Sequence, residues 1–452
     1  MIRDGGRDEW MKLLDAGLAR LEQGFAGLPE FVPATPVDRA GNELEAVLGE
    51  VGQRLCDNYP YFHPLYAGQM LKPPHPVAQA AYALAMTVNP NNHARDGGRA
   101  SSEMEMEAVA GIAAMMGWRQ DDGFLGHLTS GGTFANLEAL WVAGQAMPGR
   151  RVVASEQAHY THKRITAVLK IPFAEVRSDD RGRMDLEALE DELRRGDVGT
   201  VVATLGTTAM GAVDPLGDIL ALRERYGFRL HVDAAYGGYF RLIGSALGEN
   251  AARAYEAMTE ADSIVIDPHK HGLQPYGCGC VLFRDPAVGR FYKHESPYTY
   301  FTSSALHLGE ISLECSRAGA SAVALWATQR LLPLTPLGMA GDDFARGLAQ
   351  GRHAAMELNL CLQSDARFEA FPGGPELDIV VWRVVDAANS AQKVFDRAAK
   401  LDLHLALVQL PTRYFEKSAG GMTSCLRSVL MKPEHAAWLP EIWKRLNQAA
   451  SG

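Results

Sequence analysis

In residues 263–280, SIVIDPHKHGLQPYGCGC, a short apolar run is followed directly by several ionisable side chains. Such a cluster fits four roles: a metal site, a redox cysteine pair, a solvated turn, or a lysine used as a nucleophile. A lysine at the carboxyl edge of a sheet, partly removed from water, can act as a Schiff-base amine, so Lys270 is the candidate nucleophile. Cys278 and Cys280 share one face of a strand, but no second cysteine pair accompanies them, so zinc and redox roles are weakly supported.

A glycine turn that runs into a helix, TSGGTFANL at 129–137, is a candidate anion site. Backbone N–H groups at a helix start point outward, and the helix dipole favours negative charge there. Gly131 and Gly132 let the backbone approach a ligand closely, and Thr133 adds a hydroxyl. The alternative is a plain tight turn, and the spacing matches neither the dinucleotide-binding fingerprint nor the P-loop.

Three further strand-like segments also end in polar side chains. RLHVDAAYGG places Asp233 in an apolar run, where a carboxylate is costly unless it is paired. SEQAHYTHKR carries His159 and His162, which suit either a metal pair on one helix face or an imidazole laid against a planar ligand. ATLGTTAMGAVDP ends a strand in Thr207 and Thr208, whose hydroxyls bind a ligand or cap the turn.

These groups form a set: an anion cradle, an imidazole, a buried carboxylate and a lysine at successive strand ends. Pyridoxal 5′-phosphate (PLP) uses all four, because its phosphate takes the glycine turn, its ring nitrogen the carboxylate and its aldehyde the lysine. A hypothesis from a different class is a metal-dependent hydrolase that uses His159, His162, Asp233 and His269. A non-catalytic interaction protein is the third.

The elements that must position these side chains follow from the pattern of the 452 residues, enough for two or three domains. From about residue 100 to 290, short strands alternate with helices, which predicts a doubly wound, mostly parallel α/β sheet. Ligands of such sheets bind outside the carboxyl ends of the strands, where the polar residues cluster here. Gly196 and Gly227 are expected to end two helices. The expected divisions are a helical segment at 1–65, a large domain at 66–335 and a small α+β domain at 336–452.

Composition narrows the class of protein. The net charge is −10 and no run of Lys or Arg stands out, which argues against nucleic acid and anionic membrane surfaces as partners. No window approaches a membrane span, and the N-terminus lacks the apolar core of a secretory signal; its periodicity at 10–25 predicts an amphipathic helix. The six scattered cysteines are not a disulfide framework, so a reducing cytoplasm is expected.

The motifs SSEMEME, TSGGTFANLEAL, AHYTHKR, ATLGTTAMGAVDP, HVDAAYGG and DPHK occur in this order. With them the sequence resembles the group II PLP-dependent amino acid decarboxylases of the fold type I, aspartate aminotransferase-like superfamily. The resemblance covers about residues 55–330 and implies a mostly parallel, seven-stranded sheet between helices. It implies Lys270 as the Schiff-base lysine, Asp233 beside the pyridine nitrogen, and His159 on the ring and near the substrate carboxyl. The other implied cofactor contacts are Gly131, Gly132, Thr133 and His269 near the phosphate, Thr208 with its neighbour Thr207 near the ring hydroxyl, and Ala235 under the ring.

The implied activity is that of a lyase in amino acid and carboxylic acid metabolism: decarboxylation of an L-amino acid to its amine and CO₂ through Lys270. Alternatives with the same cofactor are another carbon–carbon lyase, a decarboxylation-dependent oxidative deaminase and an aminotransferase. The resemblance also implies a homodimer with a shared active site. The N-terminal helical segment would pack on the partner, and Thr302 and Ser303 would reach the neighbouring phosphate.

Several roles stay open at this point. The proton that replaces CO₂ comes from Tyr298, Tyr300 or His159. The resemblance supplies no role for His271. The candidate cations for an acidic side chain or the α-carboxylate are Arg317 and Arg427, and either can equally be structural. The aromatic residues of NYPYFHPLY line a substrate pocket or pack the N-terminal segment, and an aromatic or other L-amino acid is the expected substrate.

Overall fold

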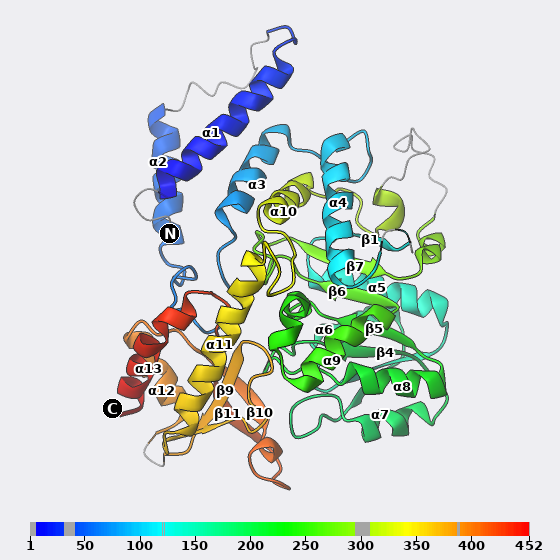
Figure 1. Ribbon diagram of the computed structural model, residues 1–452, viewed down its shortest axis with the longest axis vertical. Helices are drawn as coiled ribbons and strands as arrows, with labels where there is room; N and C mark the ends of the chain where they lie inside the picture. Colours follow the sequence, from blue (N-terminus) through cyan, green and yellow to red (C-terminus); the bar gives the residue numbers. More distant parts are fainter. Residues whose placement is uncertain are drawn as a thin grey trace.

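The computed structural model describes residues 6–30, 41–119, 121, 123–293, 308–386 and 389–451. Two helices, α1 (Gly6–Phe25) and α2 (Gly41–Leu55), come first and project from the rest of the molecule (Figure 1). α1 lies against α3 (Pro76–Val88) at Gly17, where a Cβ would lie 2.9 Å from Cδ2 of Leu84. The helix predicted from the periodicity at 10–25 is therefore present.

The central sheet has seven strands in the order β1-β7-β6-β5-β4-β2-β3. The run from β3 to β6 is parallel, while β7 pairs antiparallel with both β6 and β1. This confirms the prediction of a mostly parallel, seven-stranded sheet. The strands are β1 (Leu125–Thr129), β2 (Arg151–Ser155), β3 (Phe173–Val176), β4 (Val198–Thr204), β5 (Arg229–Asp233), β6 (Ser263–Ile266) and β7 (Gly279–Phe283).

Helices cover both faces of this sheet (Figure 1). Along the fully buried β4, Val202 packs against α5 and α6 on one face, whereas Val201 faces the larger core beneath α4, α8 and α9. Burial on both faces explains why the strands read as continuous apolar runs. The helices around the sheet are α4 (Arg99–Met115), α5 (Gly132–Ala146), α6 (Thr161–Leu169), α7 (Leu186–Leu193), α8 (Leu216–Tyr226), α9 (Glu249–Ala257) and α10 (Gly319–Leu331).

The C-terminal part builds a separate antiparallel sheet in the order β10-β11-β9-β8 around its own core, in which Trp382 is fully buried. Its strands are β8 (Phe368–Ala370), β9 (Ile379–Val384), β10 (Ala406–Pro411) and β11 (Met422–Val429). Its helices are α11 (Asp343–Gln363), α12 (Ala391–Lys400) and α13 (His435–Ser451). The domain boundaries at 65 and 335 stay a prediction.

Strand register brings the predicted site residues to one edge of the central sheet. Thr204 lies opposite Asp233, and Asp233 lies opposite Val265, just before the turn that carries Lys270. The sequence rules for helix ends held at one glycine and failed at another. Gly227 caps α8 with φ of 69°, but α7 is capped by Arg194 in a right-handed conformation, and Gly196, with φ of 78°, lies beyond it.

Candidate active site

A cavity of about 430 Å³ opens at the carboxyl edge of the sheet, between the start of α5 and the ends of β4, β5 and β6. Of the residues that the resemblance assigns to the cofactor, all but Thr207 line it: Gly131, Gly132, Thr133, His159, Thr208, Asp233, Ala235, His269 and Lys270. Residues from five separate motifs thus meet in one place.

The glycine turn forms the wall at the start of α5. Gly131, with φ of 148°, is the N-cap, and no acidic side chain lies in the first turn of the helix. A Cβ at Gly132 would lie 2.5 Å from Oδ2 of Asp267, so this position has room only for glycine. The positive end of the helix dipole and a close-lying backbone suit this wall to an anion.

Asp233 is the buried carboxylate of the cavity. Its Oδ2 accepts a hydrogen bond of 2.8 Å from Nε2 of His162, and its Oδ1 accepts one of 3.1 Å from the backbone N–H of Ala235. Burial raises the pKa of Asp233, but the hydrogen bond and charge of His162, with the charge of Lys270, outweigh burial and hold that pKa well below its usual range. Asp233 is therefore an anion aimed into the cavity.

His162 is thus bonded to Asp233 and is not paired with His159. The metal hypothesis required these two histidines to act as a pair. His159 lines the cavity, and its Nδ1 accepts a hydrogen bond of 3.3 Å from the backbone N–H of Thr161. Burial lowers the pKa of His159, and the charge of Lys270 adds to the effect against the opposing charge of Asp233. Its imidazole is consequently neutral at neutral pH.

Lys270 reaches the cavity from the turn after β6. Its Nζ lies 3.0 Å from Oδ2 of Asp267, a carboxylate that is 3% exposed and whose Oδ1 has no hydrogen-bond partner among the described residues. The neighbouring His269 is fixed by a 2.8 Å contact between Nδ1 and the carbonyl of Cys278. Burial lowers the pKa of His269.

The two threonines after β4 have different roles. Thr208 lines the cavity, whereas Thr207 is fully buried and its hydroxyl accepts a hydrogen bond of 3.0 Å from the backbone N–H of Ala212. Thr207 thus caps the turn that presents Thr208.

His271, the residue without an implied role, points away from the cavity into the contact with the C-terminal sheet. It is 1% exposed, and its Nε2 lies 3.3 Å from Oδ2 of Asp378. Oδ1 of the same carboxylate accepts a hydrogen bond of 2.6 Å from the hydroxyl of Tyr236, which lines the cavity. Burial raises the pKa of Asp378 to about 6 against the opposing effects of Tyr236 and Lys72.

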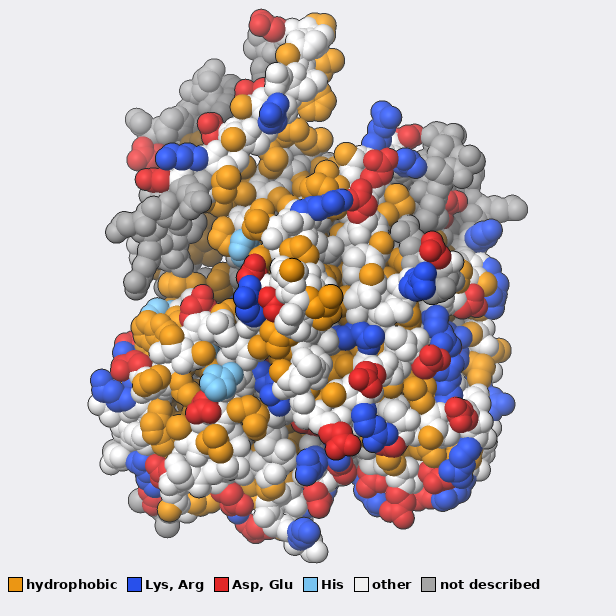
Figure 2. Space-filling view, in the orientation of Figure 1, with side chains coloured by type: hydrophobic (Ala, Val, Ile, Leu, Met, Phe, Trp, Pro, Cys, Tyr) orange, Lys and Arg blue, Asp and Glu red, His pale blue; other side chains and the backbone are white. Residues whose placement is uncertain are grey.

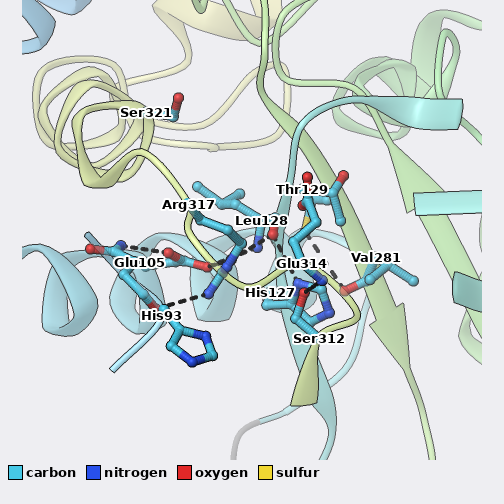
Figure 3. A network of polar contacts seen from close by, with 12 residues as sticks. His93, Glu105, His127, Leu128, Thr129, Val281, Ser312, Glu314, Arg317 and Ser321 are labelled. Carbon is cyan, nitrogen blue, oxygen red and sulfur yellow. Dashed lines mark hydrogen bonds and ion pairs between the residues drawn. The ribbon is translucent and has the colours of Figure 1, made fainter. Parts of the chain in front are cut away.

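Arg317, one of the two candidate cations for the substrate, forms an ion pair with Glu105 in this structure. Its Nη1 donates to Oε1 of Glu105 at 2.7 Å and to the carbonyl of Leu128 at 2.6 Å (Figure 3). Neither Arg317 nor Glu105 lines the cavity. Beside them, Oε2 of Glu314 accepts a hydrogen bond of 3.1 Å from the backbone N–H of Ser130, which ties this network to the glycine turn.

Arg427 is also outside the lining of the cavity. It is 3% exposed, and its Nη1 donates to the carbonyl of Gly68 at 3.1 Å and to Oε1 of Gln69 at 3.2 Å. Burial lowers its pKa. This arginine joins β11 to the segment before α3.

Sequence reasoning missed several lining residues, chiefly Asp267, Tyr236 and Asn136. A signal existed for Asp267, because a carboxylate directly after a buried strand is costly without a partner. The four residues Tyr298, Tyr300, Thr302 and Ser303 lie outside the described residues. Cys278 and Cys280 are buried, and burial raises both thiol pKa values, which leaves no reactive thiolate there.

Across the described parts of the chain, no three side chains of the His, Cys, Asp or Glu type are grouped to hold a metal ion. In the same parts, no helix combines the length and apolar character needed to cross a membrane.

Several solved structures share this fold over nearly the whole chain. Mouse CSAD superposes with a TM-score of 0.77 at 20% identity, covering 99% of each chain. The structure of Oryza sativa TDC with PLP and tryptamine gives 0.77 at 17% identity, covering 100% of this chain and 99% of the other. The predicted fold class is therefore confirmed.

The family follows from the sequence comparisons. Residues 38–384 match the pyridoxal-dependent decarboxylase conserved domain. An L-2,4-diaminobutyrate decarboxylase of Rhizobium meliloti is 30% identical over 81% of this chain and 74% of its own length. An L-tyrosine decarboxylase of Enterococcus faecium is 28% identical over 79% of this chain and 76% of its own length. The chain belongs to the pyridoxal-dependent decarboxylase family, which confirms the predicted class of enzyme, a PLP-dependent amino acid decarboxylase.

Proposed function

We propose that this enzyme removes the α-carboxyl group of an L-amino acid as CO₂ in the cavity around Lys270. One observation carries the proposal. A single cavity holds a lysine amine, a buried carboxylate that stays ionised, and a glycine-walled helix start. These are the three groups that a PLP aldehyde, pyridine nitrogen and phosphate require.

The residues present fit the cofactor. Gly131, Gly132 and Thr133, with His269 opposite, would hold its phosphate at the start of α5, where the lack of a Cβ at Gly132 keeps the wall open. Asp233 would accept a hydrogen bond from the protonated ring nitrogen, and His159 would lie on the ring. Thr208 would approach the ring hydroxyl, with Ala235 under the ring and Lys270 attached at the aldehyde.

PLP supplies an electron sink for the charge left on the α-carbon when CO₂ departs. The chain supplies the rest. Asp233 holds a proton at the ring nitrogen, and the His162 bond of 2.8 Å keeps Asp233 ionised so that it can do so. His159 orients the departing carboxylate. Lys270 must give up its ion pair with Asp267 before its amine can attach the cofactor or release the product.

The proton that replaces CO₂ has three proposed sources, His159, Tyr298 and Tyr300. Because burial lowers the pKa of His159, the imidazolium form that would act as a general acid is disfavoured. This favours a tyrosine of the 294–307 segment as donor, and the neutral His159 as the group that positions the carboxylate.

For the substrate, we propose a neutral, preferably aromatic, L-amino acid. Among the described lining residues, the ionisable cations are Lys270 and two histidines whose pKa values are lowered by burial, so no arginine is at hand for a second carboxylate. The relatives include an L-tyrosine and an L-2,4-diaminobutyrate decarboxylase, so both side-chain classes belong in the assay.

We also propose a homodimer in which the active site is completed across the interface. Support comes from the large apolar side chains exposed along α1, α2 and the segment after them (Figure 2). Leu48 is 60% and Leu55 62% exposed, which is unfavourable unless another surface covers them. A second copy of the N-terminal segment 1–65 is the proposed cover, and the cytoplasm is the proposed compartment.

One assay tests the function. Purified protein with added PLP is incubated with each of the twenty amino acids, and CO₂ and amine are measured together with keto acid and aldehyde. Equal amounts of CO₂ and amine from an aromatic amino acid support the proposal. Keto acid without CO₂ would instead indicate an aminotransferase, and aldehyde with CO₂ an oxidative deaminase.

A further inference from the structure

A second cavity, of about 290 Å³, lies between the central sheet and the C-terminal part of the chain. It shares no lining residue with the cavity around Lys270. Its wall is built from five places in the chain: the segment before α3, the turn at His271, the end of α10 at Leu332, the start of α11, and residues 432–434 before α13.

Two lysine side chains line this cavity, and the carboxylates that act on them, Asp378 and Glu434, lie beyond ion-pair distance. Lys432 is 3% exposed, and its Nζ donates to the carbonyl of Tyr66 at 2.6 Å. Nζ of Lys72 donates to the carbonyl of Met431 at 3.4 Å. Neither forms an ion pair within the described residues. Nζ of Lys432 also lies over the ring of Tyr66, 5.3 Å from its centroid. An ammonium removed from water without a close counter-charge is costly, so a bound anion would stabilise both lysines.

The helices around the cavity favour negative charge as well. Three of them begin at its wall: α3 after its N-cap His75, α11 at Asp343, and α13 directly after Glu434. Each has the positive end of its dipole at its start, although the N–H groups of Val77, His435 and Ala436 are already bonded within the wall. The acidic groups on the wall are Asp343, whose charge pairs with Arg346, and Glu434.

His271 provides a second, independent sign of a missing ligand. It lines this cavity and is 1% exposed, yet its Nδ1 has no hydrogen-bond partner among the described residues. An unsatisfied buried ring nitrogen is rare in folded proteins and calls for a partner. A ligand in the cavity can supply that partner.

We propose that the second cavity binds a small anion, a carboxylate or a tetrahedral oxyanion, between Lys72 and Lys432. The ammonium groups would neutralise it, and His271 would contact it. His271 directly follows Lys270 in the sequence and shares Asp378 with Tyr236, which lines the first cavity. The bound anion would therefore contact the residue next to the catalytic lysine.

The site also has an expected pH dependence. Burial lowers the pKa of Lys72 to about 8 and that of Lys432 to about 7, the charge of Lys72 adding to the second shift. An anion binds best when both are charged, so affinity falls as pH rises through this range. The other titratable groups that face the site are His75, His271, Asp343, Asp378 and Glu434. Both histidines are held neutral by burial.

The test uses PLP-loaded protein, so that the phosphate site of the first cavity is filled. Isothermal calorimetry with sodium sulfate and with sodium acetate, at equal ionic strength set by sodium chloride, separates oxyanion from carboxylate binding. We expect saturable binding of at least one anion, tighter at pH 6.5 than at pH 9. Lys72→Met should weaken it about 10-fold or more, since a charged contact is lost. Lys444→Met, an exposed lysine of α13, should leave it unchanged.

Two results would overturn the proposal. One is equal anion affinity in the Lys72→Met variant and the unaltered protein. The other is an adventitious ion only, seen as no saturable binding beyond that of sodium chloride. A second measurement does not depend on a variant that folds. Crystals of the unaltered loaded protein are soaked in selenate, and the anomalous signal is mapped. A peak in contact with Lys72 and Lys432 supports the site, and its absence there refutes an oxyanion site.

Discussion

Replacing His162 by leucine tests the electrostatic support of the carboxylate beneath the cofactor site. The side chain of His162 is 1% exposed and that of Asp233 is 6% exposed, and 2.8 Å separates their bonded atoms. After the replacement, the backbone N–H of Ala235 is the one hydrogen-bond donor to this carboxylate that remains among the described residues. Breaking a buried pair in this way costs about 3–5 kcal/mol. At about 2–4 °C per kcal/mol for a large domain, we expect the melting temperature of the cofactor-free protein to fall by roughly 10 °C.

The assay is calorimetry of four cofactor-free proteins at pH 7.5: unaltered, His162→Leu, Asp233→Asn and the double variant. In the Asp233→Asn background a carboxamide replaces the charge, so the leucine should cost only about 1 kcal/mol more. His353→Leu, an exposed histidine on α11, is the matched control and should change little. If His162→Leu is equally costly with and without the Asp233 charge, the pair is not what holds this carboxylate ionised.

Three further predictions follow from single contacts. Gly132→Ala should weaken PLP binding about 10-fold or more in a spectroscopic titration, because the added Cβ would lie 2.5 Å from Asp267. Gly244→Ala is the control, because a Cβ there meets nothing within 4 Å. Equal PLP affinities of the two variants would contradict the tight wall at Gly132. Arg317→Met should destabilise the protein by about 3–5 kcal/mol, because it leaves the buried Glu105 carboxylate without its ion-pair partner. The ranking of amino acids by rate of decarboxylation should stay the same. A changed ranking would make Arg317 a substrate-binding cation. For Asp378, the folded pKa of about 6 lies above 3.8, so its stability contribution is present below 3.8 and lost as pH rises through 6. At pH 8, Asp378→Asn should therefore be more stable than the unaltered protein by about 3 kcal/mol and melt at a higher temperature. This gain in stability should shrink at pH 4.5. The same gain at both pH values would contradict the raised pKa of Asp378.

The central sheet and the set of cavity residues were predictable because both follow from local patterns. Apolar runs that end in glycine, threonine, aspartate or lysine mark the carboxyl edge of a parallel sheet, and that edge collects ligands. The strand β1 was harder to see, since LGHLT carries His127 and Thr129 in its five residues. His127 is buried because its Nε2 contacts Glu138 at 2.9 Å, a pairing across a helix that no strand pattern reveals.

The parts that sequence reasoning missed depend on contacts between distant segments. His271 finds Asp378 only when the C-terminal sheet packs on the central one. Arg317 finds Glu105 across more than two hundred residues, so its charge looked free in the sequence. His162 was weighed as a metal ligand since its spacing from His159 suits one helix face, and only the sheet register places it beside Asp233.

The central claim is that Lys270 carries the cofactor, and covalent trapping tests it most directly. PLP-loaded protein is reduced with borohydride, digested and mapped by mass spectrometry. The expected result is one labelled peptide, with the cofactor mass on Lys270 and none on that peptide after Lys270→Ala. Lys72 and Lys432 have lowered pKa values and are therefore the strongest competitors. Label on either of them, with Lys270 unmodified, would contradict the account.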